Sequence, residues 1–169
     1  MPTRLLLIDD DPPGLMALAA ALRQRLPDTM VDTAASTNTA LSLLRETAYH
    51  LVISDIRMSE LDGMTLLNQV RERWPETPVI LMTAAGRDRE AEALLSGAFA
   101  YIEKPIDVER LLRIAGPAME RCVMRRQVLR ANARSLYHLS DEAQRSGIDL
   151  NPPVKDPPES PPESPHQDL

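Results

Sequence analysis

Three aspartates that are separated along the chain each follow a short apolar run. Asp9 and Asp10 come after residues 5–8, and Asp55 comes after residues 51–54. If these carboxylates meet in the fold, they repel one another unless protons or a cation neutralise them. Mg2+ prefers oxygen ligands and is commonly held by one or two carboxylates together with phosphate. The pattern therefore predicts a site for Mg2+ or Mn2+, with Asp9, Asp10 and Asp55 as ligands.

Two further polar residues, Thr83 and Lys104, follow later apolar runs. An aspartate can attack phosphorus and form an acyl phosphate when a metal and a cation absorb the charge on the transferring oxygens. We therefore predict that Asp55 is the phosphoacceptor, that Lys104 pairs with one phosphoryl oxygen and that the Thr83 hydroxyl donates to another. A group of merely solvated strand-end acids would leave Thr83 and the Lys104-Pro105 pair unexplained.

The elements that must position these residues are short strands and helices in alternation as far as residue 115, typical of an α/β protein with a parallel sheet. Right-handed connections place the carboxyl ends of all parallel strands on one edge, where open α/β sheets bind ligands. Strands are expected at residues 4–8, 30–34, 51–54, 79–82 and 100–102, and helices near 13–25, 37–47, 64–73, 88–96 and 107–115.

Beyond residue 115 the pattern changes. Gly116-Pro117 should interrupt the fifth helix, or Pro117 should begin a new one. Apolar or small residues recur three and four apart from Val108 to Leu136, except where Arg126 fills the slot, which is typical of a short coiled-coil seam. We therefore expect a first domain over residues 1–116 and a helical extension, with coiled-coil character, over 117–146.

Residues 147–169 hold seven of the chain's fifteen prolines and no aromatic residue. Such a segment buries too little apolar surface to offset the entropy of ordering, so it is expected to be a disordered, proline-rich tail.

Composition excludes several classes of protein. A net charge of -6 argues against a chain whose main work is binding nucleic acid, and the arginines of the C-terminal helix are interpreted as a charged, exposed face. No apolar run is long enough for a signal peptide or a membrane span. The single cysteine, Cys122, cannot form an internal disulfide, is interpreted as a packing residue, and fits a cytoplasmic location.

Five fragments, in order and at matching spacing, resemble the signature of the response-regulator receiver domain family. They are LLLIDDD at 5–11, VISDIRM at 52–58, LDG at 61–63, LMTA at 81–84 and YIEKP at 101–105. One departure is Ser59, where the family often carries proline. The resemblance implies a flavodoxin-like, doubly wound five-stranded sheet of strand order 2-1-3-4-5.

The resemblance also implies roles for individual residues. The backbone carbonyl of Arg57 is expected to complete the metal ligands, and Thr83 and Tyr101 resemble the family's switch pair. The Lys104-Pro105 bond is expected to be cis. The expected phosphoryl donor is a sensor histidine kinase or a phosphotransfer protein, and the chain would be a phosphoacceptor with at most slow self-dephosphorylation, not an enzyme.

The predicted function is phosphorylation of Asp55 that switches dimerisation or partner binding through residues 107–140, in a stand-alone receiver without a DNA-binding output domain. The alternative is a receiver with its dimerisation linker from a larger transcriptional activator. A flavin- or nucleotide-binding protein would need a glycine-rich loop where this chain has acids. A phosphohydrolase with an aspartyl-phosphate intermediate would need a second aspartate where Arg57 stands.

Overall fold

The structure, a computed structural model, describes residues 2–58, 62–83 and 96–145. Residues Met1–Leu129 form one compact unit, and a second unit begins at Arg130. Among the described residues, the first unit contains the whole sheet and the helices that pack on it, the last of them as far as Leu129.

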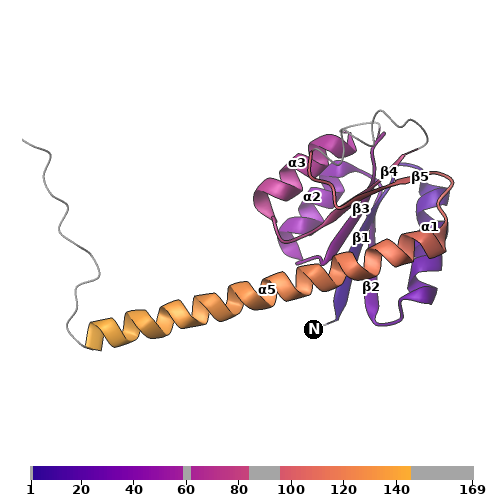
Figure 1. Ribbon diagram of the computed structural model, residues 1–169. Helices are drawn as coiled ribbons and strands as arrows, with labels where there is room; N and C mark the ends of the chain where they lie inside the picture. The colour runs from indigo at the N-terminus through magenta and orange to yellow at the C-terminus, as the bar shows by residue number, and fades with distance from the viewer. Residues whose placement is uncertain (1, 59–61, 84–95, 146–169) are drawn as a thin grey trace, which may run out of the picture. The chain divides into compact units, whose positions relative to one another are not determined.

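A parallel sheet of five strands, in the order β2-β1-β3-β4-β5, forms the centre of this unit (Figure 1). Every residue of β3 and β4 is buried, as expected for central strands that helices cover on both faces. The predicted fold and strand order are therefore confirmed. The strands are β1 (Thr3–Ile8), β2 (Thr29–Ala34), β3 (Leu51–Asp55), β4 (Val79–Thr83) and β5 (Ala100–Glu103).

The helices begin where the sequence supplies a cap. Asp11, Ser36 and Asp62 each accept a hydrogen bond from the backbone amide three residues further on, which satisfies a donor that the first helical turn leaves free. The expected helix at 88–96 lies almost entirely outside the described residues. The described helices are α1 (Pro12–Arg25), α2 (Thr37–Glu46), α3 (Gly63–Arg73) and α5 (Val108–Arg145).

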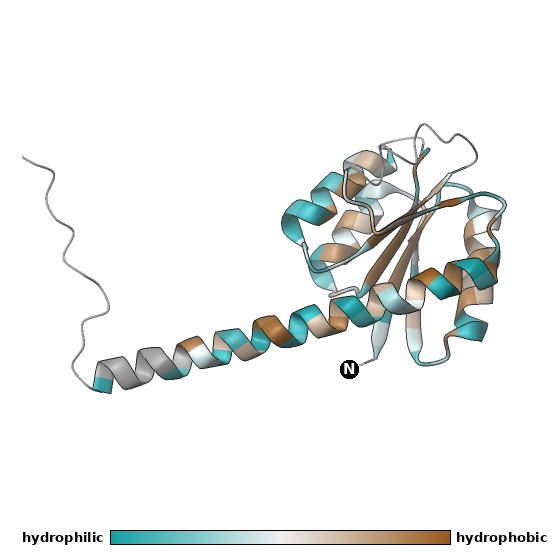
Figure 2. Cartoon of the chain, viewed as in Figure 1, coloured by the Kyte–Doolittle hydropathy of each residue, from teal (hydrophilic) through white to brown (hydrophobic). Residues whose placement is uncertain are grey.

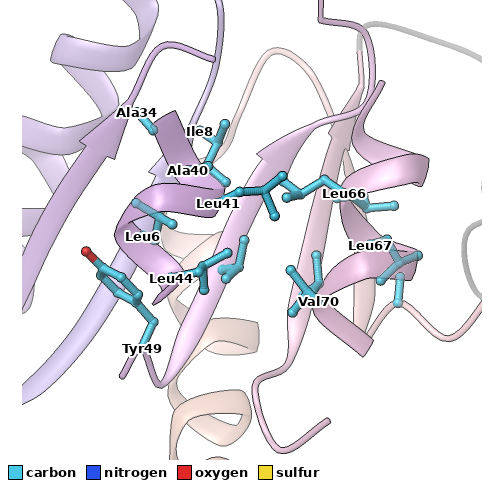
Figure 3. Close-up of a cluster of buried hydrophobic side chains, with 14 of the residues drawn as sticks. Leu6, Ile8, Ala34, Ala40, Leu41, Leu44, Tyr49, Leu66, Leu67 and Val70 are labelled. Atoms are coloured by element: carbon cyan, nitrogen blue, oxygen red, sulfur yellow. The ribbon is translucent and has the colours of Figure 1, made fainter. Parts of the chain in front are cut away.

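Two hydrophobic clusters cover the two faces of the sheet. Helices α2 and α3 pack on one face, where Leu41, Leu44 and Leu66 meet side chains such as Leu6 (Figure 3). Helix α1 and the first turns of α5 pack on the other face. The central strands of the sheet are the most continuously hydrophobic part of the unit (Figure 2). Alternate residues of each strand thus anchor opposite layers, which holds the strand ends at a common edge.

Helix α5 corrects two expectations. It continues through Gly116 and Pro117 as one helix, so the expected interruption is wrong. Pro117 cannot donate a backbone hydrogen bond, but Ala115 and Ala118 on either side of it are fully buried against the sheet. We attribute the continuity of the helix to this packing.

The second correction concerns the coiled-coil seam. Its first part, including Ala115, Met119 and Cys122, is buried within the chain's own domain and is not free for a partner helix. Arg126 also turns toward the domain, where its Nη2 donates to the Tyr49 carbonyl at 2.6 Å and to Thr77 Oγ1 at 3.0 Å. The arginine that breaks the seam pattern therefore anchors α5 to the sheet.

Further along α5, large apolar side chains are exposed. Met124, Val128, Leu129 and Leu136 are each between 47% and 67% exposed. Along the described part of α5, large exposed apolar side chains therefore begin at Met124. Among the described helices, none combines the length and the apolar character needed to cross a bilayer. The domain boundaries at 116 and 146 stay predictions.

Candidate functional site

The three predicted aspartates meet at the carboxyl edge of the sheet. Asp55 ends β3 and Asp9 follows β1, and these strands are neighbours with Ile8 beside Ser54 in register. One carboxylate oxygen from each of Asp9, Asp10 and Asp55 lies within 4.8 Å of the other two. Asp9 and Asp55 are buried, and Asp10 is more exposed. The topology thus gathers three negative charges that are far apart along the chain.

Lys104 neutralises part of this charge. Its Nζ lies 2.7 Å from Asp9 Oδ2 and 2.6 Å from Asp55 Oδ2. Burial alone would lower the pKa of Lys104, but the hydrogen bonds and charges of Asp55 and Asp9 outweigh burial and raise the pKa above its ordinary value. The ammonium therefore stays charged at neutral pH and ties β5 to the ends of β1 and β3.

Backbone amides hold the remaining oxygens of the two buried carboxylates. Asp9 Oδ1 accepts from the amide of Asp11 at 3.0 Å, and Asp55 Oδ1 accepts from the amide of Arg57 at 3.1 Å. Each carboxylate is thus held at both oxygens, so its orientation is set before any ligand arrives.

Gly63 allows α3 to begin close to Asp55. A Cβ at this position would lie 2.3 Å from the Asp55 carbonyl oxygen and 2.8 Å from the Ile56 Cα. The Gly63 amide donates to the Ile56 carbonyl at 2.7 Å. The absence of a side chain at Gly63 therefore lets the start of α3 pack closely against the backbone of Asp55 and Ile56.

Thr83 lies at the same edge of the sheet as this cluster, and Tyr101 lies two residues before Glu103 in β5. Thr83 ends β4 and is paired with Glu103 of β5, and its carbonyl accepts from the Lys104 amide at 2.6 Å. The Thr83 hydroxyl is buried and has no hydrogen-bond partner among the described residues. Tyr101 is buried in the cluster on the α2 and α3 side of the sheet. The Lys104-Pro105 bond is cis, as expected.

The donor set fits a small divalent cation. One lysine against three carboxylates leaves an excess of two negative charges, and all the ligand atoms that the acids offer are oxygens. Hard cations such as Mg2+ prefer such ligands and keep several of their waters, which suits a cluster with one exposed member.

Comparison with known proteins shows to which family the chain belongs. The response regulator receiver domain matches residues 5–115, which is well over half of the chain. The chain belongs to the response regulator receiver domain family. The predicted family is therefore confirmed, and an acidic pocket of this kind is typical of metal binding and phosphorylation in receivers.

Relatives and solved structures agree with this assignment. The transcriptional regulatory protein GlrR of Escherichia coli K12 is 40% identical over 120 residues, which are 70% of this chain and 27% of GlrR. The chain thus spans about a quarter of that relative's length.

Two solved receivers are similar in structure. One is a CheY-like receiver domain protein from Methanospirillum hungatei (TM-score 0.68, 25% identity, 74% of this chain and 99% of that chain). The other is the beryllofluoride-activated NtrC4 receiver domain dimer (TM-score 0.65, 28% identity, 70% and 98%). In both, the match spans nearly the whole of the known receiver.

Sequence reasoning identified the members of the cluster but not everything that supports them. The backbone amides of Asp11 and Arg57 were missed because no side-chain type signals them. The carbonyl of Arg57 as a metal ligand stays a prediction, and Ser59 lies outside the described residues. The close packing at Gly63 was also missed, although a glycine directly after a helix cap is a signal for such packing.

Proposed function

We propose that Asp55 accepts a phosphoryl group from a sensor histidine kinase or a phosphotransfer protein, in a reaction that depends on Mg2+ or Mn2+. The observation that carries this proposal is the cluster of Asp9, Asp10 and Asp55, in which Asp9 and Asp55 contact the Lys104 ammonium. A nucleophilic carboxylate needs both a metal site and a fixed cation beside it, and this edge offers both.

The roles of the residues follow from their positions. A carboxylate oxygen of Asp55 forms the new bond to phosphorus while the bond to the donor's leaving group breaks. Lys104, already in contact with Asp55, would pair with a phosphoryl oxygen. The Thr83 hydroxyl, which has no hydrogen-bond partner among the described residues, would donate to another. A metal held by Asp9 and Asp10, with the Arg57 carbonyl, would supply further neutralisation of the transferred group. Self-dephosphorylation is expected to be slow.

The output of the switch is proposed to pass through α5. New charge at Asp55 would favour a rearrangement of Thr83 and Tyr101, and α5 follows β5 directly in the chain. We propose that residues 107–140 form a dimer or dock a partner, with the contact made by exposed side chains such as Val128, Leu129 and Leu136. A cytoplasmic location is proposed with this role, and nucleic acid is not expected to bind directly.

Two settings suit such a switch. In one, the receiver and its helical extension act without a DNA-binding domain. In the other, they are the receiver and dimerisation linker of a transcriptional activator. The second is favoured by the low coverage of GlrR, a transcriptional regulatory protein of which the match spans 27%.

Phosphorylation is tested by intact-mass measurement after incubation with acetyl phosphate and MgCl2. The wild type should gain one labile phosphoryl group, and Asp55→Asn should gain none. EDTA should abolish the gain in the wild type. A gain of equal size in Asp55→Asn, or no gain from acetyl phosphate and from any kinase tried, would rule out Asp55 as the acceptor.

The output is tested by sedimentation of the full chain with and without beryllofluoride and Mg2+. We expect the dimer dissociation constant to change at least fivefold with beryllofluoride, and Leu129→Gln to weaken the dimer. Gln127→Ala, a neighbouring exposed substitution, serves as the control. Equal dimer affinity in the two states would contradict control through dimerisation.

A further inference from the structure

A polar cavity lies at the edge of the sheet opposite Asp55. Its volume is about 450 Å3, and its wall includes the residues that lead into β4 and β5. The other walls come from the C-terminal end of α3 and from α5, which contribute Arg71, Arg121 and Arg125. Because all strands are parallel, this cavity is at the amino ends and is separate from the phosphoacceptor cluster.

The cavity is positively charged in an acidic protein. Its three arginines face a single acid, Glu76, which leaves an excess of two positive charges, whereas the whole chain carries -6. Guanidinium groups carry a permanent positive charge in proteins, so these charges are neutralised only by neighbouring anions. A bound anion would relieve them.

Arg71 is held in place before any ligand binds. Its Nη1 donates to the Ser96 carbonyl, and its guanidinium occupies the space that a side chain at residue 97 would need. A Cβ on Gly97 would lie 2.5 Å from the Arg71 Cζ and 2.8 Å from Nη1. Gly97 also has a φ of 87°, which favours glycine. The remaining donors of Arg71 are therefore presented from a fixed position.

Arg121 is also held. Its guanidinium lies over the Phe99 ring at 5.8 Å from the ring centre, a cation–π contact. Five residues further along α5, Arg126 fixes the helix to the Tyr49 carbonyl. Guanidinium groups that are already ordered lose less entropy when an anion binds, which favours affinity.

We propose that this cavity binds a small molecule that carries a phosphomonoester. A phosphate dianion matches the excess of two positive charges, and guanidinium forks bind phosphate through paired hydrogen bonds. The volume exceeds that of a phosphate group and lies within the range of small-molecule sites. The organic part would pack against Val79, Ala98 and Phe99, which also line the cavity.

The test is NMR titration of the full chain in HEPES with EDTA at constant ionic strength, so that the metal-dependent cluster at Asp55 does not contribute. The probes are inorganic phosphate and phenyl phosphate. We expect saturable shifts of the Gly97, Ala98 and Phe99 amides, with tighter binding of phenyl phosphate. Arg71→Gln and Arg121→Gln should each weaken binding at least fivefold, while Arg113→Gln, an exposed arginine of α5 outside the cavity, should change it less than twofold.

Arg71→Lys keeps the positive charge but loses the paired N–H donors of the guanidinium, so it should still weaken binding. Because it is a conservative change, it controls for loss of binding through misfolding. Shifts that do not saturate, or that are equal in wild type and the cavity variants, would overturn the proposal. Saturable binding of a peptide with the acidic sequence of residues 147–169, without binding of either phosphate probe, would overturn the ligand class. Phosphorylation of Asp55 is measured separately and does not depend on the outcome.

Discussion

The Thr83 hydroxyl is a buried polar group without a hydrogen-bond partner among the described residues. A buried hydroxyl that makes no hydrogen bond costs stability, because it has lost its water. We therefore predict that Thr83→Val leaves the free energy of unfolding of the unphosphorylated protein within about 0.5 kcal/mol of wild type, or raises it. The same variant should lose most of the response of α5 to beryllofluoride.

Thr77→Val is the matched control for this substitution. Thr77 is also buried, but its hydroxyl donates to the Tyr49 carbonyl at 3.1 Å and accepts from Arg126. Its loss should cost about 1–3 kcal/mol in urea unfolding. If Thr83→Val were as destabilising as Thr77→Val, the Thr83 hydroxyl would have a partner in the resting protein.

At the scale of elements, alanine substitutions at two helix glycines are predicted to change the free energy of unfolding in opposite directions. Gly63→Ala places a methyl group against the Asp55 carbonyl, so α3 or the end of β3 must move. We expect a loss of about 1–3 kcal/mol in urea unfolding and slower phosphorylation by acetyl phosphate, because Asp55 is displaced.

Gly116→Ala is the companion substitution. No atom lies within 4 Å of the Cβ that it would add, and residue 116 is inside α5. Alanine favours helix over glycine by about 0.5–1 kcal/mol, so this variant should be stabilised with phosphorylation unchanged. Destabilisation by Gly116→Ala would show that α5 is not a continuous helix in solution.

At the scale of the whole molecule, Tyr49 links global stability to pH. Burial, and then the hydrogen bond from its hydroxyl to Asp32 Oδ2 at 2.9 Å, raise the pKa of Tyr49 from 10.0 to about 12. The unfolded chain loses this proton first as pH rises. The contribution of the raised Tyr49 pKa to the free energy of unfolding is therefore fully present below pH 10. It is lost between pH 10 and 12, at about 1.4 kcal/mol per pH unit.

The measurement is urea unfolding across this pH range for wild type and Tyr49→Phe. Phenylalanine keeps the buried ring (Figure 3) but has no proton to lose. The difference in unfolding free energy between the two proteins should shrink as pH rises from 10 to 12. A difference that is constant with pH would mean that the phenol titrates normally in the folded protein.

Much of the fold was set by information local to the sequence. Apolar runs predicted all five strands to within a residue or two at each end, because buried parallel strands need near-continuous apolar residues. Parallel topology then predicted that Asp9, Asp55, Thr83 and Lys104 meet at one edge, since every strand ends on the same side. Residue type and order therefore determined the family and the candidate chemistry.

Tertiary structure alone decided which side chains of α5 face the sheet. Arg125 and Arg126 are adjacent and identical in type, yet one lines the cavity and the other reaches the Tyr49 carbonyl. The continuity of α5 through Pro117 likewise depends on burial at Ala115 and Ala118. These features depend on contacts between residues that are far apart in the chain. A local sequence pattern does not identify such contact partners.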